Sequence, residues 1–491
     1  MSPCRLVAGA CVLSVLQAGC VTAPKSADRP VDIALPNAWT AGEASASPAT
    51  SPSASEAGWL DTFGDRQLVD LVAEALARNH DLRALALTLE ATRASAIIAG
   101  ADKYPQIGAG LDAARLQAAV ENGRGGATPF IDDSHQLGLN LSWEVDLWGR
   151  LRNREQAAIA DVQAAGADFS GARLSLAANV AKAWFRTTTS RLQLDLAQET
   201  VLNFNATADL VRSRFEVGVS SSLELRLALA NAASARALLD QRRQELDSAV
   251  RTLETLVGRY PANALATVEA MLELQAEVPV GLPSDLLQRR PDIFAAERRV
   301  AGADARARES RKAMLPALRL TGAGGTASSE LENLLDSGFE VWSIAAGLVQ
   351  PILQGGRLRA AADRSSILAE RTHEDYVSTL LNAFREVETT LAAEETLGHQ
   401  EESLREFAEH SAGAERLARD EYETGISDII TVLESQRRAL DARSSHLSIR
   451  EQRLRNRVDL HLALGGDFET PSAPPPGVSM PVPAAAVAAA R

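Results

Sequence analysis

The sequence predicts a mainly α-helical fold with a smaller membrane β portion, in which one plan of long helical hairpins and strands occurs twice. Three observations predict this fold. Glycine motifs repeat at a single offset, and long stretches without proline carry apolar residues at heptad spacing. Shorter stretches between them alternate apolar and polar residues, which is typical of strands.

The duplication is visible as three pairs of motifs that share one separation. The pairs are Gly149-Arg150 with Gly356-Arg357, Gly218 with Gly425, and Gly258 with Gly465. The separation is 207 residues each time, since 356 − 149 = 425 − 218 = 465 − 258 = 207. Three coincidences at one offset indicate a tandem duplication. We therefore expect a first repeat over residues 59–270 and a second over 271–470.

Each copy predicts a helical hairpin with a long and a shorter arm. Gly218 lies 69 residues after Gly149 and 40 before Gly258 (218 − 149 = 69; 258 − 218 = 40). At 1.5 Å per residue these arms are about 100 Å and about 60 Å long. Glycine at the restart of the periodicity is typical of a turn. The heptad positions are Val162, Phe169, Leu176, Ala183, Leu194, Val201, Ala208 and Phe215, then Leu225, Ala232, Leu239, Leu246 and Leu253, and Leu433, Leu440, Leu447 and Leu454.

A shorter predicted helix opens each half. We expect one helix over residues 65–100. Its counterpart is the stretch over 282–292 followed by a helical run over 295–314. The motif Arg289-Arg290-Pro291-Asp292 precedes the second. This motif could hold an anion, but proline at a helix start and aspartate in the first turn favour the beginning of a helix.

Between the opening helix and the hairpin, each half changes to a period of two. Residues 137–147 alternate strictly, residues 107–113 alternate before them, and we expect a loop over 119–134. The second half repeats this around 318–320 and 342–348, with an expected loop over 326–338. Alternation predicts strands with one apolar face, and about 12 residues suit a tilted strand across a membrane. We interpret Gly322–Gly325 as a flexible loop rather than a phosphate site.

Four strands cannot close a barrel alone. An open edge in lipid leaves amides unpaired at several kcal/mol each, and the smallest outer-membrane barrels have about eight strands. Several chains would therefore share one barrel. A soluble β-sandwich with helical arms is the alternative that would also explain the alternation.

The N-terminus predicts a signal peptide over residues 1–19. Arg5 precedes a short apolar run that ends in Leu16-Gln-Ala-Gly-Cys20, which resembles the bacterial lipoprotein pattern. We expect lipid attachment at Cys20, including palmitate, and Val21 in the next position implies delivery to the outer membrane; an ordinary signal peptide is the alternative. Residues 20–58 predict a lipidated tether, and residues 471–491 a disordered Pro/Ala-rich tail.

The sequence predicts no enzyme, no metal site and no cofactor. The seven histidines lack ligand spacing, and neither a nucleophile elbow nor a Walker loop occurs. The formal net charge of −14 disfavours nucleic-acid binding. Energy for any transport would come from a partner.

The chain resembles the TolC-type outer-membrane factors, in particular the NodT-like lipoprotein branch that serves resistance-nodulation-division (RND) pumps. The resemblance covers about residues 59–468. It rests on 141–150, 282–292, 351–357, 383–388 and the two Gly-x-Ser turns. It implies a homotrimer with four strands per chain in a shared 12-stranded β-barrel, continued by a helical tunnel through the periplasm.

The same resemblance implies an exit duct in the outer membrane. Such a duct passively conducts drugs or other small molecules from an inner-membrane RND pump, with a periplasmic adaptor protein between them. The alternatives are a structural coiled-coil lipoprotein that spans the periplasm and the duct of a type I protein secretion system. Paired amphipathic strands favour a duct, because a strut has no use for a barrel.

The resemblance also implies a functional site at the two hairpin tips, which form the periplasmic mouth. The residues assigned to the tips and to adaptor docking are Phe215, Gly218, Ser220, Tyr422, Gly425 and Ser427. Those assigned to an acidic ring at the mouth are Glu224, Asp428 and Glu434. Ser427 stands where the best-known gate has an arginine, and Thr431 where it has an acid. Solvated helix faces and simple turns are the alternative explanations.

Overall fold

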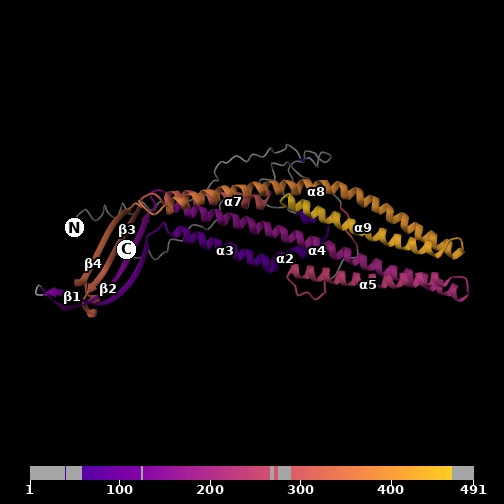
Figure 1. Cartoon of the computed structure of the whole chain (residues 1–491), viewed down its shortest axis with the longest axis horizontal. Coiled ribbons are helices and arrows are strands. Elements are labelled where there is room, and N and C mark those ends of the chain that lie inside the picture. Colours follow the sequence, from indigo (N-terminus) through magenta and orange to yellow (C-terminus); the bar gives the residue numbers. More distant parts are fainter. Residues whose placement is uncertain (1–38, 40–57, 123–124, 266–269, 275–288, 467–491) are drawn as a thin grey trace.

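The computed structural model describes residues 39, 58–122, 125–265, 270–274 and 289–466, which form one elongated body (Figure 1). A four-stranded sheet lies at one end, and the turns of two helical hairpins lie at the other. Helices run along the long axis between these ends. The molecule therefore has a sheet end and a tip end, separated by the length of its longest helices.

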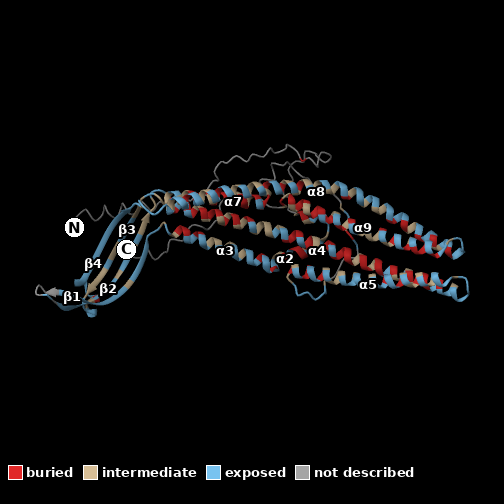
Figure 2. Cartoon of the chain, viewed as in Figure 1, coloured by how far each residue is buried: buried red, intermediate tan, exposed pale blue. Residues whose placement is uncertain are grey.

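The two predicted hairpins are confirmed with the predicted lengths. In the first repeat α4 (Arg150–Glu216, 67 residues) returns through α5 (Ser222–Val257, 36 residues). In the second, α8 (Arg357–Thr424, 68 residues) returns through α9 (Ile429–Ala463, 35 residues). Every predicted heptad position except Phe215 is buried or half-buried, and buried residues recur along the helices (Figure 2).

The opening helix of the first half differs from the prediction. A short 3-10 helix, η2 (Trp59–Phe63), is followed by α2 (Arg66–Arg78) and α3 (His80–Ala101). The single helix expected over 65–100 is wrong, because Asn79 adopts an extended conformation and its side chain accepts the N–H of Leu82 at 2.9 Å. Asn79 also donates to the Leu256 carbonyl at 3.1 Å, which fixes the break against the end of α5.

The opening helix of the second half is α7 (Pro291–Lys312). It begins at the proline, with Asp292 in its first turn, so the predicted helix start is confirmed. Arg290 pairs with Asp292 at 2.6 Å and with Glu386 of α8 at 2.8 Å. Arg290 therefore has a structural role, since its ion pairs join the start of α7 to α8.

The sheet is antiparallel in the order β1-β2-β3-β4. Its strands are β1 (Gln106–Asn122), β2 (Gly126–Val145), β3 (Ala317–Ser328) and β4 (Glu340–Val349), with the short helices η4 (Leu331–Leu335) and η5 (Ser337–Phe339) between β3 and β4. Four strands were predicted and four are present in the described part of the chain.

Two loop predictions inside the sheet are wrong. The segment 119–134 belongs almost wholly to β1 and β2, because the pairing continues from Gln106↔Ser142 out to Asn122↔Gly126. Backbone pairing in a hairpin does not require apolar side chains, so the polar composition there misled the prediction. The segment Gly322–Gly325 lies within β3, and a Cβ on Gly325 would stand 2.1 Å from the Leu137 carbonyl oxygen. Glycine there permits close approach of β2 and β3.

The strand register separates an apolar face from a small or polar one. Directly paired residues share a face of the sheet. One row across the four strands is Ala109, Leu139, Gly324 and Trp342, and the next row is Gly108, Asn140, Ala323 and Ser343. Leu139 is 58% exposed and Trp342 is 78% exposed. The apolar face of the sheet is therefore uncovered within one chain.

The main core lies where α2, the long arm α4 and the two return arms α5 and α9 come together, midway along the body. Trp184 and Phe185 of α4 are its largest fully buried side chains. The indole N–H of Trp184 donates to the carboxylate of Asp65 at 2.8 Å, and Asp65 also caps α2. This core joins the first repeat to Leu454 and Val458 of α9. The predicted signal peptide, Cys20 and the C-terminal tail lie outside the described residues.

Candidate functional site at the hairpin tips

The first tip is a tight turn closed by backbone hydrogen bonds. Gly218 has φ +80°, and the N–H groups of Val219 and Ser220 both donate to the Arg214 carbonyl, at 2.8 and 3.2 Å. Helix α5 then begins with a capping box between Ser221 and Glu224. Each of these two residues accepts the other's backbone N–H, so the return helix has a defined start.

The second tip repeats this geometry. Gly425 has φ +82°, and the N–H groups of Ile426 and Ser427 donate to the Glu421 carbonyl at 2.8 and 3.2 Å. Asp428 caps α9 by accepting the N–H of Thr431 at 2.8 Å. The hydrogen bonds from Thr431 lower the pKa of the Asp428 carboxyl, which is therefore charged near neutral pH. Both tip glycines occupy the left-handed region, as a turn of this type requires.

An arginine that the sequence did not reveal joins the two tips. Arg214, near the end of α4, donates to the carbonyls of Tyr422 at 3.0 Å and Glu423 at 2.9 Å. Its guanidinium carbon also lies 4.4 Å from the centre of the Tyr422 ring, a cation–π contact. Arg214 thus caps the C-terminal end of α8 from the other hairpin, where positive charge is favourable. We call this set of contacts the tip latch.

Tyr422 is placed differently from the other predicted tip residues. Its exposed fraction is 5%, and it packs in a cluster with Val211, Ile429 and Val432. Tyr422 is therefore part of the core between the hairpins within one chain. Although the ring of Tyr422 is packed on its neighbours, the buried Tyr422 hydroxyl has no hydrogen-bond partner among the described residues.

The three predicted acidic residues have local structural partners. Glu224 belongs to the capping box and Asp428 to the α9 cap. Glu434 pairs with Arg437 at 3.0 Å, three residues along the exposed face of α9. All three lie at or near the starts of the return helices: Asp428 is the N-cap of α9, Glu224 is in the first turn of α5, and Glu434 is the sixth residue of α9. They therefore gather at the tip end. One chain by itself forms no ring of them.

The outer surface of the tips is apolar, and of its exposed apolar residues only Phe215 was expected at the tips. Val217, Val219 and Ile426 are 74%, 72% and 78% exposed, and Phe215 is 40% exposed. Apolar residues inside a glycine turn were the available signal, because turns are ordinarily polar. Exposed apolar side chains gathered at one end make the tips a candidate surface for a protein partner.

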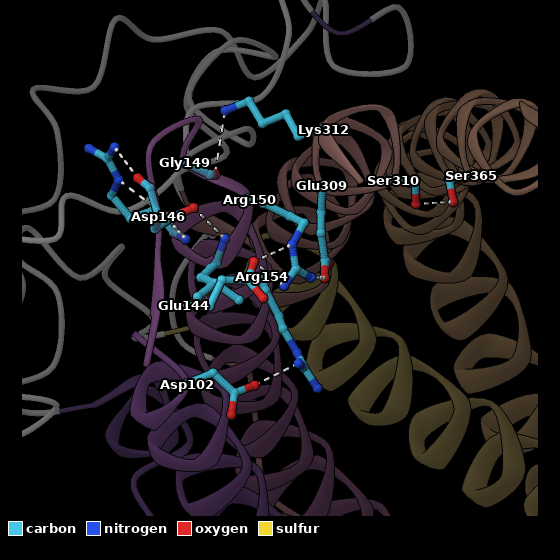
Figure 3. A network of polar contacts seen from close by, with 12 residues as sticks. Asp102, Glu144, Asp146, Gly149, Arg150, Arg154, Glu309, Ser310, Lys312 and Ser365 are labelled. Atoms are coloured by element: carbon cyan, nitrogen blue, oxygen red, sulfur yellow. Dashed lines mark hydrogen bonds and ion pairs between the residues drawn. The ribbon is translucent and has the colours of Figure 1, made fainter. Parts of the chain in front are cut away.

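The opposite end of the helices is tied to the sheet by a polar network (Figure 3). Arg150, the first residue of α4, bonds Glu144 of β2 at 2.8 Å and approaches Glu309 of α7 to 4.0 Å. Asp146 accepts the N–H of Arg152 at 2.9 Å and so serves the start of α4. Further contacts in Figure 3 are Arg154 with Asp102 and Lys312 with the Gly149 carbonyl. In the first repeat the Gly149-Arg150 motif therefore marks the junction between strand and helix.

The described part of the chain holds no group of His, Cys, Asp and Glu side chains that could bind a metal ion. The polar groups at the tips are hydrogen-bonded to turns and helix ends instead. The site consists of two hydrogen-bonded turns with an apolar outer surface, and Arg214 joins the two turns.

A known protein family has the same sequence pattern. The model of the outer membrane efflux protein family matches residues 71–259 and 282–466. The chain belongs to this family. Each matched segment falls within one of the two predicted repeats, so the family pattern covers both hairpins and all four strands.

Relatives of this efflux protein are similar to it in sequence over nearly their whole lengths. The probable efflux pump outer membrane protein SepC of Pseudomonas putida is 33% identical over 94% of this chain and 97% of its own. The pyoverdine export outer membrane protein OpmQ of the same species is 32% identical over 86% and 92%. The open state of the MtrE outer membrane channel of Neisseria gonorrhoeae superposes with a TM-score of 0.80 at 30% identity, over 92% of this chain and 99% of that one. This efflux protein thus has the fold of an outer-membrane channel.

Proposed function

We propose that three copies of this chain close one 12-stranded barrel and one helical tunnel, and that the trimer is the exit duct of a tripartite efflux system. Small molecules would enter at the hairpin tips and leave through the barrel. The observation that carries the proposal is the open four-stranded sheet with an uncovered apolar face. Such a sheet is stable in lipid only when its edges are closed by other strands.

The two free edges of the sheet support closure by neighbouring copies. β1 and β4 are the edge strands, and all ten residues of β4 are exposed. Pairing β4 of one copy with β1 of the next leaves no edge unpaired in a ring. Three copies give about 12 strands, above the lower limit of about eight for closed outer-membrane barrels.

The helices next to these edges carry matching apolar faces. Helix α3 leads into β1 and is long and apolar enough to cross a membrane by length and composition, yet only 11% of its most apolar window is buried. Leu87 and Ile98 of α3 are 70% and 68% exposed. Helix α8 follows β4 and exposes Ile367 and Leu381 at 63% and 51%. Closing the ring would bring α3 of one copy against α8 of the next and bury both faces.

The membrane position of the trimer follows from its two ends. The apolar face of the sheet would meet outer-membrane lipid, and lipid attached to Cys20 would add a second anchor. The helical body would extend into the periplasm, where the exposed apolar tips would dock a periplasmic adaptor protein attached to an inner-membrane RND pump. Named relatives export pyoverdine or toluene. For this chain we propose the class of small molecules that such a pump delivers, without a single specific cargo.

Single-channel recording in planar lipid bilayers tests the duct. The purified protein should produce discrete conductance steps once inserted. A periplasm-spanning strut without a continuous pore would produce none, even when it binds to the bilayer through its lipid. Absence of steps from protein of verified trimeric mass would therefore overturn the exit-duct function.

A further inference from the structure

A single tryptophan of the N-terminal segment is fixed to the helical body. Of residues 1–57 the structure describes Trp39, which is 5% exposed. Its ring lies 6.1 Å from that of Phe384 on α8, tilted by 51°. Its other buried neighbours come from α7, α8 and α9, namely Ile293, Leu380, Ala383, Val387 and Ala463. The tether expected from composition therefore has a fixed point.

The seat of Trp39 exists only where three helices of the second repeat have packed together. Polar contacts join the same helices beside it. Arg290, at the start of α7, donates to the Ala463 carbonyl of α9 at 3.0 Å and pairs with Glu386 of α8 at 2.8 Å. An aromatic side chain seated there is held by the folded repeat as a whole.

We propose that Trp39 is a plug that fastens the lipidated N-terminal segment to the second repeat, and that residues 21–38 are a leash of limited length between plug and membrane. The leash rests on the lipid attachment at Cys20 proposed above; the plug does not. The occupant of the seat is thus a segment of this same chain. Its effect is to couple the membrane anchor to the packing of α7, α8 and α9.

The available chain length fits this arrangement. Phe384 lies 27 residues after Arg357, where α8 begins at the sheet end (384 − 357 = 27), so the seat is about 40 Å from the strand–helix junction. Cys20 lies 19 residues before Trp39 (39 − 20 = 19), and that chain reaches about 65 Å when extended. The acyl chains can therefore enter the membrane while the plug is seated. A leash of fewer than about 12 residues could not span the distance.

Photocrosslinking in the full-length protein tests the plug and the leash together. p-Benzoylphenylalanine replaces Trp39, because it is aromatic and reacts only with groups in contact. We expect intramolecular crosslinks to peptides containing Leu380–Val387, Ile293 or Ala463. Deleting residues 25–34 leaves 9 residues to Cys20 (39 − 20 − 10 = 9), about 30 Å, and should lower the crosslink yield at least threefold. The matched control lacks residues 25–28, leaves 15 residues or about 50 Å, and should keep the full yield.

The possible results separate the two halves of the proposal. Crosslinks in the full-length protein that avoid these peptides overturn the plug. An unchanged yield in the ten-residue deletion, in chains that incorporate labelled palmitate, overturns the leash. Lack of palmitate in the full-length protein contradicts lipid attachment and with it the leash, whereas crosslinks to the seat in that same protein support the plug.

Discussion

At the scale of single residues, Arg214 changes the interpretation of the tips most. The resemblance had placed a gate arginine at the position of Ser427. In the structure an arginine of the other hairpin, Arg214, covers Tyr422. The internal offset of 207 pairs Arg214 with Glu421, so the two copies differ at this position. The duplication produced two turns of the same geometry. Arg214, whose counterpart in the second repeat is Glu421, joins them.

Replacing Arg214 by alanine should loosen the second tip. The change removes two hydrogen bonds from a charged donor and a cation–π contact, together worth about 2 kcal/mol. Amide hydrogen exchange over residues 415–428 should then accelerate about tenfold or more. Arg212→Ala is the matched control, because Arg212 is exposed and pairs with Asp209 within α4. Equal exchange rates in both variants would show that the latch does not hold the tip.

His461 is a second residue whose surroundings set a measurable property. It is buried against Trp59, at 5.5 Å between ring centres, and against Phe63. Burial, and then the nearby Arg457, lower its pKa from 6.5 to about 4, while Glu394 opposes the shift. The folded protein therefore holds this imidazole neutral where the unfolded chain would already bind a proton.

The stability of the protein should fall as the pH drops from about 6.5 to 4. Over that window the unfolded chain binds a proton at His461, whereas the folded protein keeps this imidazole neutral. The free energy of unfolding is therefore lower by roughly 3 kcal/mol at pH 4 than above pH 6.5. Above pH 6.5 this contribution to stability is complete. Thermal unfolding midpoints measured against pH should fall less steeply for His461→Gln than for the wild type. The exposed His410→Gln should follow the wild type; the same slope in all three proteins would refute the assignment.

At the scale of elements, the return helices begin with acidic side chains that serve as caps. Glu224 and Asp428 carry out this role within one chain. Threefold repetition about one axis would still concentrate their charge at the mouth, since capping leaves a carboxylate charged. Structural and electrostatic roles are therefore compatible in the same residues.

The double variant Glu224→Gln with Glu434→Gln should reduce the preference of the channel for cations. Glutamine can keep the capping box at position 224, so the helix start is preserved while charge is removed. Reversal potentials across a salt gradient measure the change. Glu370→Gln with Glu395→Gln removes the same charge from exposed positions of α8 far from the tips and should leave selectivity unaltered. Unaltered selectivity in the first variant would place these carboxylates outside the conducting path.

The strands make a separate prediction about the two faces of the sheet. Leu139 lies in the apolar row and Asn140 in the polar row. Leu139→Arg should destabilise the membrane-inserted protein by about 2–4 kcal/mol if the position is near the bilayer midplane, and Asn140→Arg should cost much less. Unfolding by denaturant in detergent or lipid vesicles measures the difference. A larger cost at Asn140 would assign the faces the other way.

The elements were predictable where their signal is local. Heptads and glycine turns placed the hairpin from 149 to 218, and α4 spans Arg150–Glu216. The strand ends were not predictable, because charged residues such as Asp132 and Asp133 pair in register with β1 as well as apolar ones do. Asn79 is a cap-forming residue whose signal was present but was outweighed by the Ala/Leu run around it. The latch and Trp39 depend on contacts between distant parts of the chain, which no local pattern encodes.

At the scale of the whole molecule, the proposed duct depends on completion of the sheet by other copies of the chain. One chain leaves two sheet edges free, an apolar sheet face uncovered and an apolar α3 exposed. Each of these features is costly in isolation and is satisfied in a ring of like chains. The tip latch and the strand–helix junction would then keep each copy rigid between its two functional ends.

Native mass spectrometry of the purified protein in detergent micelles counts the chains directly and therefore tests the proposed shared barrel. A shared barrel predicts a single dominant assembly of three chains, which dissociates only on heating or in strong denaturant. Leu139→Arg should weaken that assembly, and Asn140→Arg should preserve it. A stable monomer as the dominant species, with the strands still folded, would contradict the shared barrel and with it the proposed duct.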